Sequence, residues 1–130
     1  MNQNGEIRTT TSGSESLYPE AQATFYGRNG EVRPAGTARY SIEMDEAKIY
    51  PDRFQASDYR TENALLSEVS EQAQAQGVDK INVWVKDEGG DPQRWARHNF
   101  HPTERDPGAK RRFLAETDIG RYGSQKLPPI

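Results

Sequence analysis

Apolar and polar residues alternate with a period of two in several short segments, which is typical of strands with one buried face. The first two such segments are residues 21–26 and 35–44, and Gly27-Arg28-Asn29-Gly30 lies between them. Asn-Gly is a strong hairpin signal, so we expect these segments to pair. A third strand is predicted at residues 48–55, and it should be bulged at Pro51, which lacks a backbone amide.

One longer segment follows a helical period instead. Its apolar positions fall on one stripe of a 3.6-residue repeat, and they are Leu65, Leu66, Val69 and Ala73. Thr61 is a suitable N-cap residue for this helix. Gly77 suits the left-handed position that ends a helix, and Val78 can supply the accompanying apolar contact.

The rest of the pattern predicts a strand at 80–85, a short helix at 91–97, and two final strands at 100–103 and 112–117. A helix between two strands indicates a crossover that makes those strands parallel neighbours. The expected fold class is therefore α/β or α+β. It has a mixed, mostly antiparallel sheet, one main helix and one short helix.

Composition adds tails to this picture. Only 32% of the 130 residues are hydrophobic, and both ends of the chain are polar and without periodicity. Such segments cannot bury enough apolar surface to offset the entropy lost on ordering. We expect a disordered tail at residues 1–16, a single domain at 17–122 and a second tail at 123–130, with a protein partner as one means of holding the tails.

Several classes of site and location are excluded. The chain has no cysteine, so it has no disulfide, no zinc finger and no cysteine nucleophile. Two histidines without a carboxylate set make a poor metal site, and no metal is expected. No apolar run approaches 20 residues, and the first residues lack the features of a secretory signal. We therefore expect a cytoplasmic protein that does not span a membrane.

Charge is unevenly distributed along the chain. The formal net charge is −3, yet residues 91–130 hold 8 lysines and arginines against 5 aspartates and glutamates. The candidate partner-binding residues in this region are Arg94, Trp95, Arg97, Lys110, Arg111 and Arg112. This basic group is compatible with a protein or anionic ligand, with nucleic acid through phosphate contacts, or with a solvated surface. The acidic net charge counts against a dedicated nucleic-acid binder.

Residues 49–117 resemble the GNAT superfamily of N-acetyltransferases in the order and spacing of their segments. A strand leads into Tyr59-Arg60, and a helix with a Leu65-Leu66 pair follows. The short helix ends at Asn99-Phe100, where the family has Gly-Phe, and residues 112–117 match the family's last strand. The resemblance implies a GNAT-like fold and transfer of an acyl group from acetyl-CoA or another acyl-CoA to an amine.

The family binds the coenzyme pyrophosphate with a glycine-containing loop at the start of the main helix, where backbone amides point at the phosphates. The positions that correspond to this cofactor-binding segment are Ala56, Arg60, Thr61, Glu62 and Asn63. Asn63 stands at the first glycine position, and Leu65 does not fit the second. Glu62 would repel a pyrophosphate. In a purely structural alternative, Thr61 and Glu62 cap the helix and complement its dipole.

The catalytic positions also depart from the family. Its general acid is a tyrosine in the short helix, and that position holds Trp95, whose indole cannot serve as an acid. Tyr59, Tyr50 and Tyr122 are candidate replacements that the sequence alone does not rank, and Tyr59 is the one taken forward. Asp52, on the strand before the loop, is the candidate general base.

Two hypotheses follow: an acyl-CoA-dependent N-acyltransferase, or a non-catalytic GNAT-fold module that binds a partner through its basic face. An open gap with free amides near residues 59–66 would favour the first. A gap filled by Leu65 or Glu62 would favour the second.

Overall fold

The computed structural model describes residues 5–13, 17–43, 46–86, 91–105 and 112–118. They form seven strands and two helices: β1 (Glu6–Ser12), β2 (Glu20–Tyr26), β3 (Val32–Glu43), β4 (Glu46–Ala56), α1 (Tyr59–Ala75), β5 (Lys80–Lys86), α2 (Asp91–Ala96), β6 (His101–Arg105) and β7 (Arg112–Asp118). The strands make one sheet in the order β1-β2-β3-β4-β5-β7-β6. Strands β4 and β5 are parallel, and all other neighbours are antiparallel. The expected α+β class with a mixed, mostly antiparallel sheet is confirmed.

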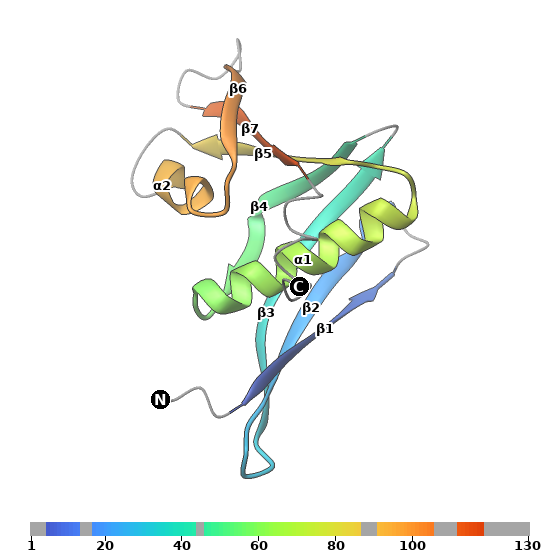
Figure 1. Ribbon diagram of the computed structural model, residues 1–130, viewed down its shortest axis with the longest axis vertical. Coiled ribbons are helices and arrows are strands. Elements are labelled where there is room, and N and C mark those ends of the chain that lie inside the picture. Colours follow the sequence, from blue (N-terminus) through green and yellow to red (C-terminus); the bar gives the residue numbers. More distant parts are fainter. Residues whose placement is uncertain (1–4, 14–16, 44–45, 87–90, 106–111, 119–130) are drawn as a thin grey trace, which may run out of the picture.

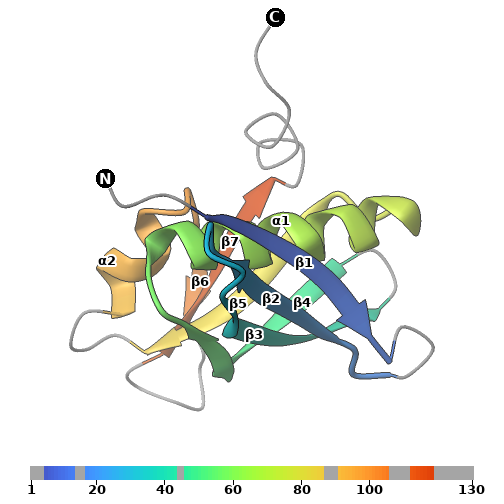
Figure 2. The ribbon, with the colours of Figure 1, turned by 90° about the horizontal axis from the view of Figure 1, so that it is seen from below.

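The main helix covers one face of the sheet. Helix α1 crosses strands β1 to β4, whereas α2 lies at the other end, beside β5 and β6 (Figures 1 and 2). The stripe predicted for α1 is buried, and Leu65, Leu66, Val69 and Ala73 have no exposed surface. They pack on inward-facing side chains of the strands, including Tyr40 and Ile49. No helix in the described part of the chain is long and apolar enough to cross a membrane.

Strand β1 corrects the expectation of a tail over residues 1–16. Residues Glu6–Ser12 pair with β2 along their whole length. The inward-facing side chains of β1 include Thr9 and Thr11, whose hydroxyls donate to the Glu68 carboxylate of α1 at 2.9 and 2.7 Å. The inward-facing positions of this strand are therefore largely polar, and a search for alternating hydrophobic residues cannot reveal such a strand.

The ends of α1 differ from expectation at one terminus only. Asp58, not Thr61, is the N-cap residue, because its carboxylate accepts the backbone N–H of Thr61 at 2.8 Å. This contact lowers the pKa of Asp58 below its ordinary value. The other end is as predicted: Gly77 has φ of 80°, and the buried Val78 donates its amide to the Ala73 carbonyl at 2.9 Å.

Strand β4 carries the bulge expected at Pro51. Its register against β3 pairs Ala38 with Phe54 but Tyr40 with Ile49, so β4 has three more residues than β3 in this interval. Pro51 lies inside it, where no ladder hydrogen bond is required of its nitrogen. The bulge changes the direction of β4 just before α1 begins.

The same strand separates from its parallel neighbour. Pairing of β4 with β5 covers only three positions, from Ala47 opposite Ile81 to Ile49 opposite Val83. Beyond this point β4 continues beside β3, and β5 continues beside β7. The sheet therefore opens between β4 and β5 on the side where the bulge lies.

Candidate functional site

A pocket of about 680 Å³ lies where β4 and β5 separate. We call it the bulge pocket, and it is lined by Lys48–Arg53 together with Tyr18, Arg39 and Trp84. Lys48 and Trp84 alternate with the buried Ile49 and Val83, so they point to the sheet face opposite those core side chains. This volume is in the range of small-molecule sites in proteins.

Asp52, the candidate general base, is one of the lining residues of the bulge pocket. It is exposed and is carried by the three-residue bulge, which turns this part of β4 away from the regular ladder. Trp84, which would be core if both sheet faces were covered, is only partly buried and forms part of the pocket wall. The sequence placed Asp52 on the correct strand, and its catalytic role stays a prediction.

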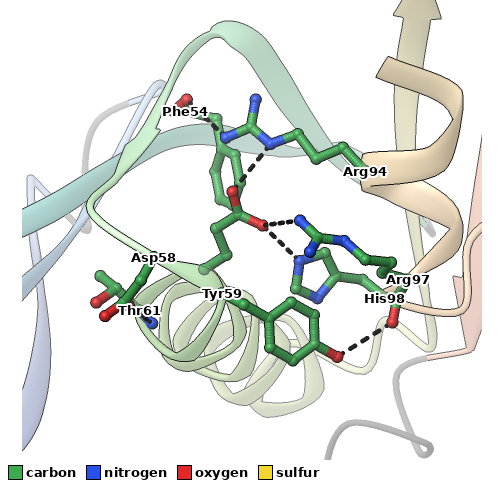
Figure 3. Close-up of polar contacts among 8 residues, drawn as sticks. Phe54, Asp58, Tyr59, Thr61, Arg94, Arg97 and His98 are labelled. Carbon is green, nitrogen blue, oxygen red and sulfur yellow. Dashed lines mark hydrogen bonds and ion pairs between the residues drawn. The ribbon is translucent and has the colours of Figure 1, made fainter. Parts of the chain in front are cut away.

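A partly buried polar group lies at the start of α1, and we call it the Glu62 cluster: Glu62, Arg94, Arg97 and His98. Glu62 is 7% exposed. One carboxylate oxygen, Oε2, accepts from Arg94 Nε at 3.0 Å, and the other, Oε1, contacts His98 Nε2 at 2.7 Å. Arg97 Nη2 approaches Oε1 at 4.0 Å. Figure 3 shows Arg94, Arg97 and His98 reaching from the α2 side toward the start of α1.

Further contacts join the same two helices. Arg94 Nη2 donates to the Phe54 carbonyl of β4 at 3.5 Å. Tyr59, the candidate general acid, stacks on the His98 ring with centroids 4.7 Å apart, and its hydroxyl donates to the Arg97 carbonyl at 3.1 Å (Figure 3). The structure therefore places Tyr59 with the Glu62 cluster, and Tyr59 is not among the lining residues of the bulge pocket that holds Asp52.

The protonation of His98 follows from these contacts. A carboxylate only accepts hydrogen bonds, so His98 must donate its Nε2–H to Glu62. Burial lowers the pKa of His98 below its ordinary value of 6.5; Glu62 acts in the opposite direction, and Arg97 and Arg94 lower it further. The neutral imidazole is thus the form that the folded protein prefers.

This preference predicts a pH dependence of stability. Below pH 6.5 the unfolded chain takes up a proton at His98 more readily than the folded protein does. The free energy of unfolding should therefore decrease as the pH is lowered. The variant His98→Gln should flatten that slope between about pH 5 and 6.5 in urea unfolding. His101→Gln, at an exposed position, is the control and should keep the slope. An unchanged slope in His98→Gln would contradict this assignment.

The other residues predicted to bind the coenzyme do not form an open cradle. Ala56 is the last residue of β4, and Ser57 and Asp58 alone connect it to α1. Thr61 is 1% exposed, and its amide is taken by Asp58. Arg60 is exposed and donates to the Gly5 carbonyl at 3.0 Å. Asn63 lies within the first turns of α1 rather than in a loop.

The predicted partner surface is only partly described. Trp95 is 1% exposed and packs between Phe54 and Phe100, so it is corrected from a surface residue to a core residue. Arg94 and Arg97 belong to the Glu62 cluster. Lys110 and Arg111 lie outside the described residues, and Arg112 is described only as the first residue of β7.

Comparison with known proteins identifies the fold. No family model matches the sequence, and no curated protein sequence matches it. Among solved structures, the PaiA N-acetyltransferase from Thermoplasma acidophilum, in complex with coenzyme A, is similar with a TM-score of 0.63 and 15% identity, over 82% of this chain and 64% of that one. A Bacillus subtilis acetyltransferase in complex with CoA has a TM-score of 0.57 and 10% identity, over 88% and 98%.

A GNAT-family acetyltransferase from Staphylococcus aureus has a TM-score of 0.57 and 14% identity, over 81% of this chain and 70% of that one. The chain has the GNAT fold. The resemblance seen in residues 49–117 is thus confirmed at the level of the fold, and it extends to the first strands of the sheet. The chain spans 64% of the length of the Thermoplasma protein.

The coenzyme implied by the GNAT fold does not fit the start of α1 in this chain. A pyrophosphate needs free amides at the helix N-terminus. Here the Asp58 carboxylate occupies the Thr61 amide, and a second carboxylate, Glu62, is fixed one residue further on. The Glu62 oxygens are already engaged by Arg94 and His98, and the two-residue link between β4 and α1 leaves no loop to approach a pyrophosphate.

The Glu62 cluster is the part of the site that sequence analysis missed. Arg94 and His98 lie 32 and 36 positions after Glu62 in the chain. A weak signal existed, since Arg94, Arg97 and His98 recur at helical spacing and Glu62 is an acidic residue in the first turn of a helix. Only the fold shows that these two segments face each other.

Proposed function

We propose that this protein is a GNAT-fold ligand-binding module that does not use acyl-CoA. The observation that carries the proposal is the Glu62 cluster, which joins the start of α1 to α2 where a coenzyme would have to enter. The buried Glu62 carboxylate accepts from Arg94 and His98 together, so its removal would cost both side chains this shared acceptor. Occupation of the helix start by Glu62 and its partners is the outcome that favours the non-catalytic hypothesis. The bulge pocket is the candidate binding site of this module.

Acetyl-CoA titration tests this proposal. Calorimetry and thermal unfolding with acetyl-CoA up to roughly 1 mM should show no binding heat and no rise in Tm, because a ligand that binds only the folded state must stabilise it. The control is Glu62→Gln, which removes the charge but restores neither the loop nor the glycines and should also fail to bind. Saturable binding of acetyl-CoA to the unmodified protein would overturn the proposal.

A second candidate, an N-acyltransferase that acts on an amine, has one observation in its favour. Asp52 lines the bulge pocket and could accept a proton from an ammonium group held there. Under this alternative, acetyl-CoA would bind, and incubation with amines would release free thiol. Asp52→Asn would then abolish thiol release without preventing acetyl-CoA binding.

A further inference from the structure

The lining of the bulge pocket is mainly positively charged, whereas the whole chain has a negative net charge. Arg39, Lys48 and Arg53 line the pocket, and among the described residues Asp52 is the one acidic side chain in the lining. The whole chain carries a net charge of −3, so this local excess of positive charge is not a general property of the surface. A concave site with one dominant sign of charge attracts ligands of the opposite sign.

The three cations differ in how they are already engaged. Arg39 donates to the Tyr18 carbonyl at 2.7 Å and pairs with Glu20 at 3.4 Å, so it is held in the wall. Lys48 and Arg53 form no ion pair with any side chain in the described part of the chain. These two cations can therefore bind an incoming anionic group.

The remaining wall of the pocket is aromatic. Tyr18 and Tyr50 meet edge to face with ring centroids 5.9 Å apart, and the Tyr50 hydroxyl is 3.1 Å from Ser41 Oγ. Trp84 contributes to the wall from β5, and Pro51 adds apolar surface on the bulge. Flat apolar groups pack well against such side chains, and the Tyr50 ring is fixed by its two contacts.

We infer that the bulge pocket binds a small organic anion, a carboxylate or phosphate joined to a planar ring. The anionic group contacts Lys48 and Arg53, and the ring packs among Tyr18, Tyr50 and Trp84. Asp52 adds a subsite for an amino group on the same molecule. This inference rests on the proposed ligand-binding function and names the class of ligand.

Three probes that share a phenyl ring test the inference: 3-phenylpropionate, L-phenylalanine and phenethylamine. They carry a carboxylate, both charges, and an amine alone. We expect the two carboxylates to bind at least about tenfold more tightly than phenethylamine. NMR titration of the protein with each probe, up to roughly 10 mM, measures the affinities. The protein has two tryptophans, and the Trp84 indole N–H signal should shift whereas that of the buried Trp95 should not.

Matched variants separate charge from folding. Lys48→Glu and Arg53→Glu should each weaken 3-phenylpropionate binding about tenfold or more, and Arg28→Glu, on the exposed turn, should leave it unchanged. Asp52→Asn should weaken L-phenylalanine but not 3-phenylpropionate. The inference is overturned if neither carboxylate binds, if phenethylamine binds as tightly, or if Lys48→Glu and Arg53→Glu fold but bind normally. Acetyl-CoA binding bears on the proposed function alone, so the two failures remain distinguishable.

Discussion

Replacing Glu62 with alanine should lower the free energy of unfolding by roughly 2–3 kcal/mol. The substitution leaves Arg94 and the fully buried His98 without their shared acceptor. The loss is smaller than for a completely buried ion pair because the Arg94 side chain keeps 27% of its surface in water. Urea unfolding followed by circular dichroism measures it. Hydrogen exchange at α2 should quicken in the same variant, since the cluster holds α2 to α1.

Two further variants make this result specific. Glu62→Gln should lower the free energy of unfolding less than Glu62→Ala does, because the glutamine amide oxygen still accepts one hydrogen bond. It should still destabilise the protein, because the glutamine NH₂ group then faces another donor. Glu43→Ala, at the exposed last residue of β3, should change stability by no more than about 0.5 kcal/mol. Equal stability of Glu62→Ala and the unmodified protein would show that the cluster does not hold the helices together.

Replacing Trp95 with alanine should destabilise the protein by about 3–5 kcal/mol. Its ring lies 5.1 Å from that of Phe54 and 5.2 Å from that of Phe100, which it meets edge to face. Removing it leaves a cavity between β4 and α2 that the surrounding side chains cannot fill. Urea unfolding of Trp95→Ala, with Trp84 as the fluorescent reporter, gives the value.

The matched variant is Trp95→Phe, which keeps most of the ring volume. Within the described residues, the buried Trp95 Nε1 has no hydrogen-bond partner, so phenylalanine removes an unpaired N–H along with some packing. We expect a cost well below that of alanine. Trp84→Ala, at a partly exposed position, should cost about 1 kcal/mol. A loss in Trp95→Ala no larger than in Trp84→Ala would contradict the core role of Trp95.

Local signals in the sequence predicted most of the fold. Asn29-Gly30 marked the hairpin between β2 and β3, and Gly77 marked the end of α1, because left-handed backbone is strongly residue-specific. Pro51 marked the bulge because its nitrogen cannot donate. Each of these features depends on a few neighbouring residues, which is why sequence alone was sufficient.

Features that depend on distant pairing could not be predicted in this way. Strand β1 was missed because its buried face carries Thr9 and Thr11, whose partner Glu68 lies more than fifty residues away. The N-cap was placed at Thr61 rather than Asp58 because both residue types occur at N-caps, although aspartate is the more favoured of the two. Trp95 was assigned to a surface because basic residues surround it in the sequence, whereas the structure turns its side chain into the core.

The short parallel seam between β4 and β5 has a consequence for cooperativity. Within the described residues, backbone pairing between the four strands under α1 and the three strands beside α2 covers three positions on each strand. Hydrogen bonds along that seam are therefore few, and the contacts from α1 to α2 act as a second attachment between two halves of one molecule. Acid and high salt weaken ionic contacts. They should therefore reduce the cooperativity with which the two halves unfold more than they reduce the stability of either half.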